Sequence, residues 1–189
     1  MPIHLPAPPV NGQALVMRAL ECAVPNAAGS MPYVTGPALL LNPYRGYYAS
    51  LSSVAAGEGL GTARAYGWRY VIAQGGVLVT AVELVDQGPP VGLSWYATFH
   101  PPLDSELLAL NQAEDVGGVP NHDYELRYLR IPGLDLAALW LKDQSRDDDR
   151  LIPIEPVPDY LVANKTYTAE EFSDLIRGPA HRAVVPPPP

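Results

Sequence analysis

Cysteine is almost absent from this sequence, which contains only Cys22. A single thiol cannot form an intramolecular disulfide, and it excludes a metal centre built from several cysteines. The sequence also lacks an apolar run of about 18 residues, which a membrane-spanning helix requires. Its N-terminus has neither the positive charge nor the unbroken apolar stretch of a signal peptide. We therefore expect a soluble, cytoplasmic protein with no membrane partner.

Basic side chains are also scarce. The chain has 12 lysines and arginines against 20 aspartates and glutamates, and its formal net charge is −8 at pH 7. An acidic surface repels a phosphate backbone and cannot release its counterions. Direct nucleic-acid binding is therefore excluded from the function classes that we consider. The acidic residues are dispersed apart from one short run, which also disfavours a surface that imitates DNA.

Recognisable cofactor and nucleophile motifs are missing as well. The glycines of segment 57–61 have no predicted strand before them, and no lysine followed by serine or threonine after them, as a phosphate-binding loop requires. Segment 92–96, which contains Ser94, lacks the second glycine of a nucleophile elbow. The sequence therefore predicts no cofactor, and it assigns no catalytic residue by motif.

One segment has spacing like that of a metal site. Oxygen ligands occur at alternate residues, as in a calcium loop, at Asp143, Ser145, Asp147 and Asp149. However, Asp148 occupies the position that needs glycine, and Ile154 occupies the position that needs a bidentate carboxylate. A polar hairpin tip between Lys142 and Leu151 explains the same residues. We favour the hairpin tip and predict no metal.

Prolines divide the chain into segments, since there are 22 of them in 189 residues. Regular structure is expected between them. Apolar spacing predicts helices at about 13–23, from Tyr47 to near Gly57, at 104–113 with its leucines facing inward, and from Thr168 to Gly178-Pro179. Thr168 and Glu171 form the pattern of a capping box.

Segments rich in β-branched and aromatic residues predict strands. They are a short buried strand at 38–41 and strands at 68–74, 77–85, 93–100, 124–131, 137–142 and 151–154. Gly75-Gly76 is typical of a tight hairpin. In the 93–100 strand, Leu93, Trp95 and Ala97 alternate with more polar residues, so one face is expected to be covered.

These elements together predict the α+β class. Helices lie before, within and after the strands, so a doubly wound parallel sheet is disfavoured. We expect a mainly antiparallel sheet of about five or six strands with helices packed on one face. The predicted organisation is one domain over 1–182, whose residues 1–10 form a proline-rich arm, followed by a proline-rich tail at 183–189. That tail either docks on a partner or is a disordered terminus.

Two groups of titratable residues are weak candidates for chemistry. His100 lies four residues before Asp104, and His122 is followed by Asp123 and Glu125. Such groups can supply nitrogen and carboxylate ligands to a metal, or act as acid–base pairs, if the fold brings them together. Both histidines also occupy ordinary positions for a solvated imidazole, at a strand end and at a strand start. Sequence alone leaves open whether His100, Asp104, His122 and Asp123 converge.

Tyrosine is abundant, and this is the main positive clue to function. The chain has 11 tyrosines and three tryptophans but only two phenylalanines. Such amphipathic aromatic rings are common at protein interfaces. Six of the tyrosines gather around the second predicted helix and the first strands: Tyr44, Tyr47, Tyr48, Tyr66, Tyr70 and Tyr96. They form either an exposed aromatic surface or the rim of an ordinary core.

Two hypotheses about function follow. The first is a non-enzymatic protein–protein interaction module, such as an adaptor, inhibitor, immunity-type or assembly protein, for which homo-oligomerisation is possible. The second is an enzyme or small-ligand-binding protein whose site is assembled from residues far apart in sequence, with the histidine and aspartate candidates above. The missing catalytic motifs and the surplus of tyrosine favour the first.

Overall fold

The computed structural model describes residues 3–23, 39–41, 43–89, 91–99, 103–117 and 122–184. These residues contain four α-helices and nine strands. The strand pairings within the two units described below are antiparallel, apart from one isolated parallel bridge. The α+β class and the mainly antiparallel sheet are thus confirmed. The predicted five or six strands were too few, partly because the short strands β2 (Tyr44–Tyr48) and β9 (Tyr167–Thr168) carry no pattern long enough to detect.

The chain forms two compact units whose segments alternate along the sequence. Unit 1 comprises Met1–His4, Gly46–Ala65 and Ser105–Pro189, and unit 2 comprises Leu5–Arg45 and Tyr66–Asp104. Neither unit is one continuous stretch of chain. The single domain expected over 1–182 stays a prediction, and each unit is described by itself.

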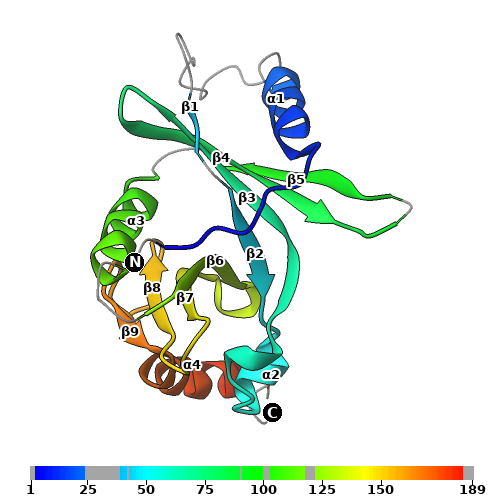
Figure 1. The fold of residues 1–189 in the computed structure, drawn as a ribbon. Coiled ribbons are helices and arrows are strands. Elements are labelled where there is room, and N and C mark those ends of the chain that lie inside the picture. The colour runs from blue at the N-terminus through cyan, green and yellow to red at the C-terminus, as the bar shows by residue number, and fades with distance from the viewer. Residues whose placement is uncertain are drawn as a thin grey trace. The chain divides into compact units, whose positions relative to one another are not determined.

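Unit 2 is built on a long hairpin (Figure 1). Its strands, in hydrogen-bonded order, are β5 (Leu93–Phe99), β4 (Val77–Asp86), β3 (Arg64–Gln74) and β1 (Leu39–Leu40). Gly75 and Gly76 join β3 to β4 with φ angles of 59° and 82°. This left-handed conformation is that of a two-residue hairpin turn, so the predicted hairpin is confirmed.

The core of unit 2 lies between helix α1 (Gly12–Ala23) and the β3–β4 hairpin. The predicted helix at 13–23 is therefore confirmed. Its buried residues are Val16, Ala19, Trp68, Tyr70, Ile72, Val82 and Leu84. The other face of the β3–β4 hairpin carries a buried ion pair, in which Arg69 Nη1 lies 2.8 Å from Glu83 Oε1. Tyr66 Oη donates to the other oxygen of Glu83 at 2.9 Å.

The hydroxyl of Tyr70 is buried without a hydrogen-bond partner among the described residues. A buried unpaired hydroxyl costs about 1–3 kcal/mol. We therefore expect Tyr70→Phe to leave the free energy of unfolding unchanged or to raise it by about 1 kcal/mol, as measured by urea unfolding. Tyr167→Phe is the control, because the hydroxyl of Tyr167 accepts a hydrogen bond from the backbone N–H of Val162 at 2.9 Å. The free energy of unfolding of Tyr167→Phe should fall by about 1 kcal/mol. Equal losses in the two variants would contradict the prediction.

Unit 1 contains a second antiparallel sheet segment. Its strands, in order, are β6 (Tyr124–Ile131), β7 (Leu136–Asp143), β8 (Arg150–Ile154) and β9. The predicted strands at 124–131, 137–142 and 151–154 are confirmed. Residues on both faces of this segment are buried. Leu129 and Trp140 belong to the core cluster on one face, and Leu139 and Ile152, which pair with each other, lie on the other face.

Helix α4 (Ala169–Val184) contributes three residues to the core of unit 1, Phe172, Ile176 and Ala180. Its predicted capping box is confirmed. The N–H of Glu171 donates to Thr168 Oγ1 at 3.1 Å, and the N–H of Thr168 donates to a carboxylate oxygen of Glu171 at 2.9 Å. The predicted end at Gly178-Pro179 was wrong, because the buried stripe continues one turn further to Ala180 and stabilises the helix beyond the proline.

Two other helix predictions also need correction. Tyr47 belongs to strand β2, and helix α2 (Leu51–Ala55) begins only after Ser50, whose hydroxyl accepts a hydrogen bond from the N–H of Ser53. In helix α3 (Asp104–Gly117), Leu108 is exposed while Ala109 and Ala113 are buried. The buried residues of this helix are Ser105, Glu106, Ala109, Ala113 and Gly117, whereas Leu107 and Leu110 are only half-buried. The short strand β1 is also less buried than expected, since Leu39 is exposed.

Candidate functional site

His122 is held at the start of β6 by a buried carboxylate. Its Nδ1 lies 2.8 Å from Oδ2 of Asp143, and its ring stacks on that of Tyr124 with centroids 5.2 Å apart. The other oxygen of Asp143 accepts hydrogen bonds from the N–H of Ser145 at 2.9 Å and of Arg146 at 3.0 Å. Burial by itself would raise the pKa of Asp143, but the hydrogen bonds from His122, Ser145 and Arg146 outweigh it and hold the pKa well below its ordinary value.

This arrangement supports the turn, and it does not place Ser145 as a nucleophile activated by His122. The hydroxyl of Ser145 donates to Asp143 at 2.9 Å, not to His122. A serine nucleophile would instead need the imidazole as its base. Three of the four hydrogen bonds to the Asp143 carboxylate come from the turn after β7, and the fourth joins it to His122, just before β6. The histidine–aspartate pair therefore acts as a clamp within unit 1.

Asp149 organises the other side of the same turn. Its Oδ2 accepts a hydrogen bond from Trp140 Nε1 at 2.9 Å. Its Oδ1 accepts from the N–H of Asp143 at 3.0 Å and from Lys142 Nζ at 3.1 Å. Donors thus occupy the carboxylate oxygens of Asp143 and Asp149, two of the four calcium-loop positions. The described residues include no group of three or more His, Cys, Asp or Glu side chains that could hold a metal ion. β7 and β8 form the predicted hairpin, with its polar tip in this segment.

The remaining histidine and aspartate candidates do not form a demonstrated site. His100 lies outside the described residues. Asp104 is an exposed residue at the start of α3, and Asp123 is half-buried, with its carbonyl accepting a hydrogen bond from the N–H of Gln144 at 2.8 Å. The sequence left open whether they converge with His122, and the described residues do not answer that question.

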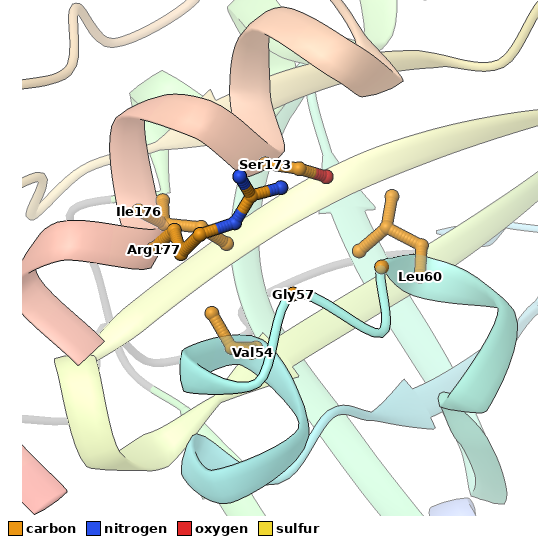
Figure 2. A pocket seen from close by; sticks show the side chains of 7 residues that line it. Val54, Gly57, Leu60, Ser173, Ile176 and Arg177 are labelled. Carbon is orange, nitrogen blue, oxygen red and sulfur yellow. The ribbon is translucent and has the colours of Figure 1, made fainter. Parts of the chain in front are cut away.

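A small depression lies between α4 and the loop after α2 (Figure 2). Its lining residues are Val54, Gly57, Gly59, Leu60, Ser173, Ile176 and Arg177. It encloses about 10 Å³, which is room for about one water molecule. The guanidinium of Arg177 fills the space beside Gly57, where a Cβ would lie 3.1 Å from Nε. The glycine-rich segment therefore offers no space for a phosphate or a metabolite here.

The tyrosines that sequence analysis singled out have different environments. Tyr44 and Tyr70 are buried, whereas Tyr66 is half-buried. The ring of Tyr47 packs against Trp140, with centroids 5.5 Å apart and an angle of 74° between the rings. Only Tyr48 and Tyr96 among the six are exposed. Most of the cluster thus belongs to the cores, and the interface hypothesis depends on a smaller set of residues.

That smaller set lies on and beside β5, and we call Val91, Trp95 and Tyr96 the β5 patch. Their exposed fractions are 61%, 54% and 59%. Trp95 pairs with Leu84 and Ala97 pairs with Glu83, so Tyr96 is an extra residue without an opposite partner on β4. This β-bulge breaks the expected alternation and redirects side chains. Within the described part of unit 2, β5 pairs with β4 alone and is an outer strand.

Comparisons with known proteins provide no further guide to this site. No family model matches the chain, and no curated protein or solved structure matches it. Within the described ranges, no helix is long and apolar enough to span a membrane. The geometry of the chain itself therefore has to support any functional assignment.

Proposed function

We propose that this protein is a protein–protein interaction module that binds its partner through the β5 patch. The observation that carries this proposal is the exposure of Trp95 and Tyr96, both more than half accessible on an outer strand. Tryptophan and tyrosine dominate binding energy at interfaces, because they combine a large apolar surface with a hydrogen-bonding group. Two adjacent exposed rings therefore favour a contact surface.

The charge distribution around β5 supports the same proposal. No aspartate, glutamate, lysine or arginine occurs from Gln87 to Leu103, a stretch of 17 residues in a chain that is 17% charged. About three charged residues would be expected in a stretch of that length. The centres of protein interfaces are depleted of charged residues in the same way. An uncharged strand with exposed aromatic rings suits partner binding better than permanent contact with water.

The clamp and the depression described above favour no second function. His122 and Asp143 are engaged in turn contacts, and the space beside Arg177 holds about one water molecule. An adaptor, an inhibitor, an immunity-type protein or an assembly protein would each use a surface like the β5 patch. The choice among these classes belongs to the same proposal and depends on the identity of the partner.

Affinity capture tests this proposal with three forms of the full chain. The wild type is compared with the double variant Trp95→Lys/Tyr96→Lys and with the control Leu108→Lys, whose side chain is 55% exposed on α3. We expect a stoichiometric partner from the native lysate to bind the wild type and the control, and to be lost from the double variant. Equal capture by all three forms would place the interface elsewhere and refute the proposal.

A further inference from the structure

We infer that the partner of the β5 patch is a second copy of this chain, which places its own β5 patch against the first around a twofold axis. This inference rests on the proposed function and adds the identity of the partner. Contacts around a twofold axis use the same surface on both copies, so the surface has to be complementary to itself. The residues of β5 itself satisfy this requirement in charge, and the strand satisfies it in its position at the edge of the unit 2 strands.

Charge is the first requirement. Each copy carries a formal charge of −8, so two copies repel one another over most of their surfaces. Repulsion is weakest where neither copy presents a charged side chain, and no aspartate, glutamate, lysine or arginine occurs from Gln87 to Leu103. A cationic partner would instead gain most from the acidic surfaces elsewhere. An uncharged patch on an acidic chain therefore suits another copy of itself.

The geometry of the strand meets the second requirement. Natural outer strands usually carry a charged residue that prevents association, but none occurs between Leu93 and Phe99. The bulge at Tyr96 interrupts the backbone ladder, so we expect side-chain packing and not a continuous sheet across the two copies. Two tryptophans and two tyrosines can pack edge to face around a twofold axis. Figure 1 shows β5 on the side of β4 that faces away from β3.

Such a contact is small, and its size determines the experiment. The β5 patch contributes three side chains per copy, fewer than the roughly 20 residues per side of a standard stable interface. The dimer should therefore dissociate in the micromolar range or above. Sedimentation equilibrium of the full chain from about 1 to about 500 µM covers that range. The comparison uses the wild type, Tyr96→Lys, Tyr96→Ser and the control Leu108→Lys.

We expect the wild type and Leu108→Lys to dimerise with the same dissociation constant. In Tyr96→Lys the constant should rise at least about tenfold, because two like charges would meet near the axis. Tyr96→Ser should weaken the dimer by a smaller factor, and circular dichroism verifies that each variant is folded. If Tyr96→Lys fails to fold, Tyr96→Ser decides the question.

Two results would overturn the inference. One is a wild type that stays monomeric over the whole concentration range, and the other is a dimer that both Tyr96 variants leave unchanged. Affinity capture separates this failure from failure of the proposed function. Suppose that the chain is monomeric, but that it captures a different protein and Trp95→Lys/Tyr96→Lys abolishes that capture. The proposed function would then hold, with another partner than a second copy. A monomeric chain whose captured proteins are unchanged by the double substitution would contradict both proposals.

Discussion

Replacing Gly67 by alanine should lower the free energy of unfolding by about 3 kcal/mol or more. Gly67 is buried within β3 and pairs with Val85 of β4. A Cβ built at this position would lie 1.8 Å from the carbonyl oxygen of Leu84 and 2.9 Å from the Cα of Val85. Both atoms belong to the backbone, so no change of rotamer can relieve the clash. The hairpin would have to separate locally and lose part of its ladder.

Gly61→Ala is the matched control for this substitution. A Cβ at Gly61 would meet no heavy atom within 4 Å. The free energy of unfolding of Gly61→Ala should stay within about 0.5 kcal/mol of the wild-type value. Urea unfolding followed by circular dichroism measures both variants, and failure of Gly67→Ala to fold would agree with the prediction. A loss below about 1 kcal/mol in Gly67→Ala would show that β4 can move away at little cost.

Asp149→Ala is the second substitution with a large expected effect. Its carboxylate accepts hydrogen bonds from the indole of Trp140, the backbone N–H of Asp143 and the ammonium group of Lys142. Alanine would leave two buried N–H groups without an acceptor, at about 1–3 kcal/mol each. We expect the free energy of unfolding to fall by about 3 kcal/mol or more, as measured in urea.

Asp147→Ala controls for the loss of one negative charge in the same turn. Asp147 is exposed, so this variant should change stability by no more than about 0.5 kcal/mol. Near-ultraviolet circular dichroism adds a second measurement, because Trp140 is buried beside the carboxylate of Asp149. Equal stabilities of the two variants would mean that water replaces the lost acceptor.

Features determined by nearby residues were predictable from the sequence. The Gly75-Gly76 hairpin depends on two adjacent residues that adopt positive φ, and the capping box of α4 depends on Thr168 and Glu171, three positions apart. Such preferences belong to short segments and remain when the chain folds. The same holds for the apolar spacing that identified α1.

Features determined by distant residues were not predictable. His122 and Asp143 are 21 positions apart, and only the pairing of β6 with β7 brings them together. The β5 patch escaped detection because a bulge shifts the register at Tyr96, and alternation along the strand does not reveal a bulge. The inner face of α3 was assigned to leucines because hydrophobicity ranks them above the alanines that pack there.

The interleaving of the two units has a consequence for how the chain is made. Every segment of unit 2 precedes residue 105. The Gly46–Ala65 segment of unit 1, in contrast, is synthesised before the segment Ser105–Pro189, which makes up most of the same unit. At ribosomal rates of about 5–20 residues per second, those 85 residues take roughly 4–17 s to appear. During that interval unit 2 is already complete in sequence. Nascent chains arrested shortly after the emergence of Asp104 would therefore contain one unit with all of its segments and one still lacking most of its strands.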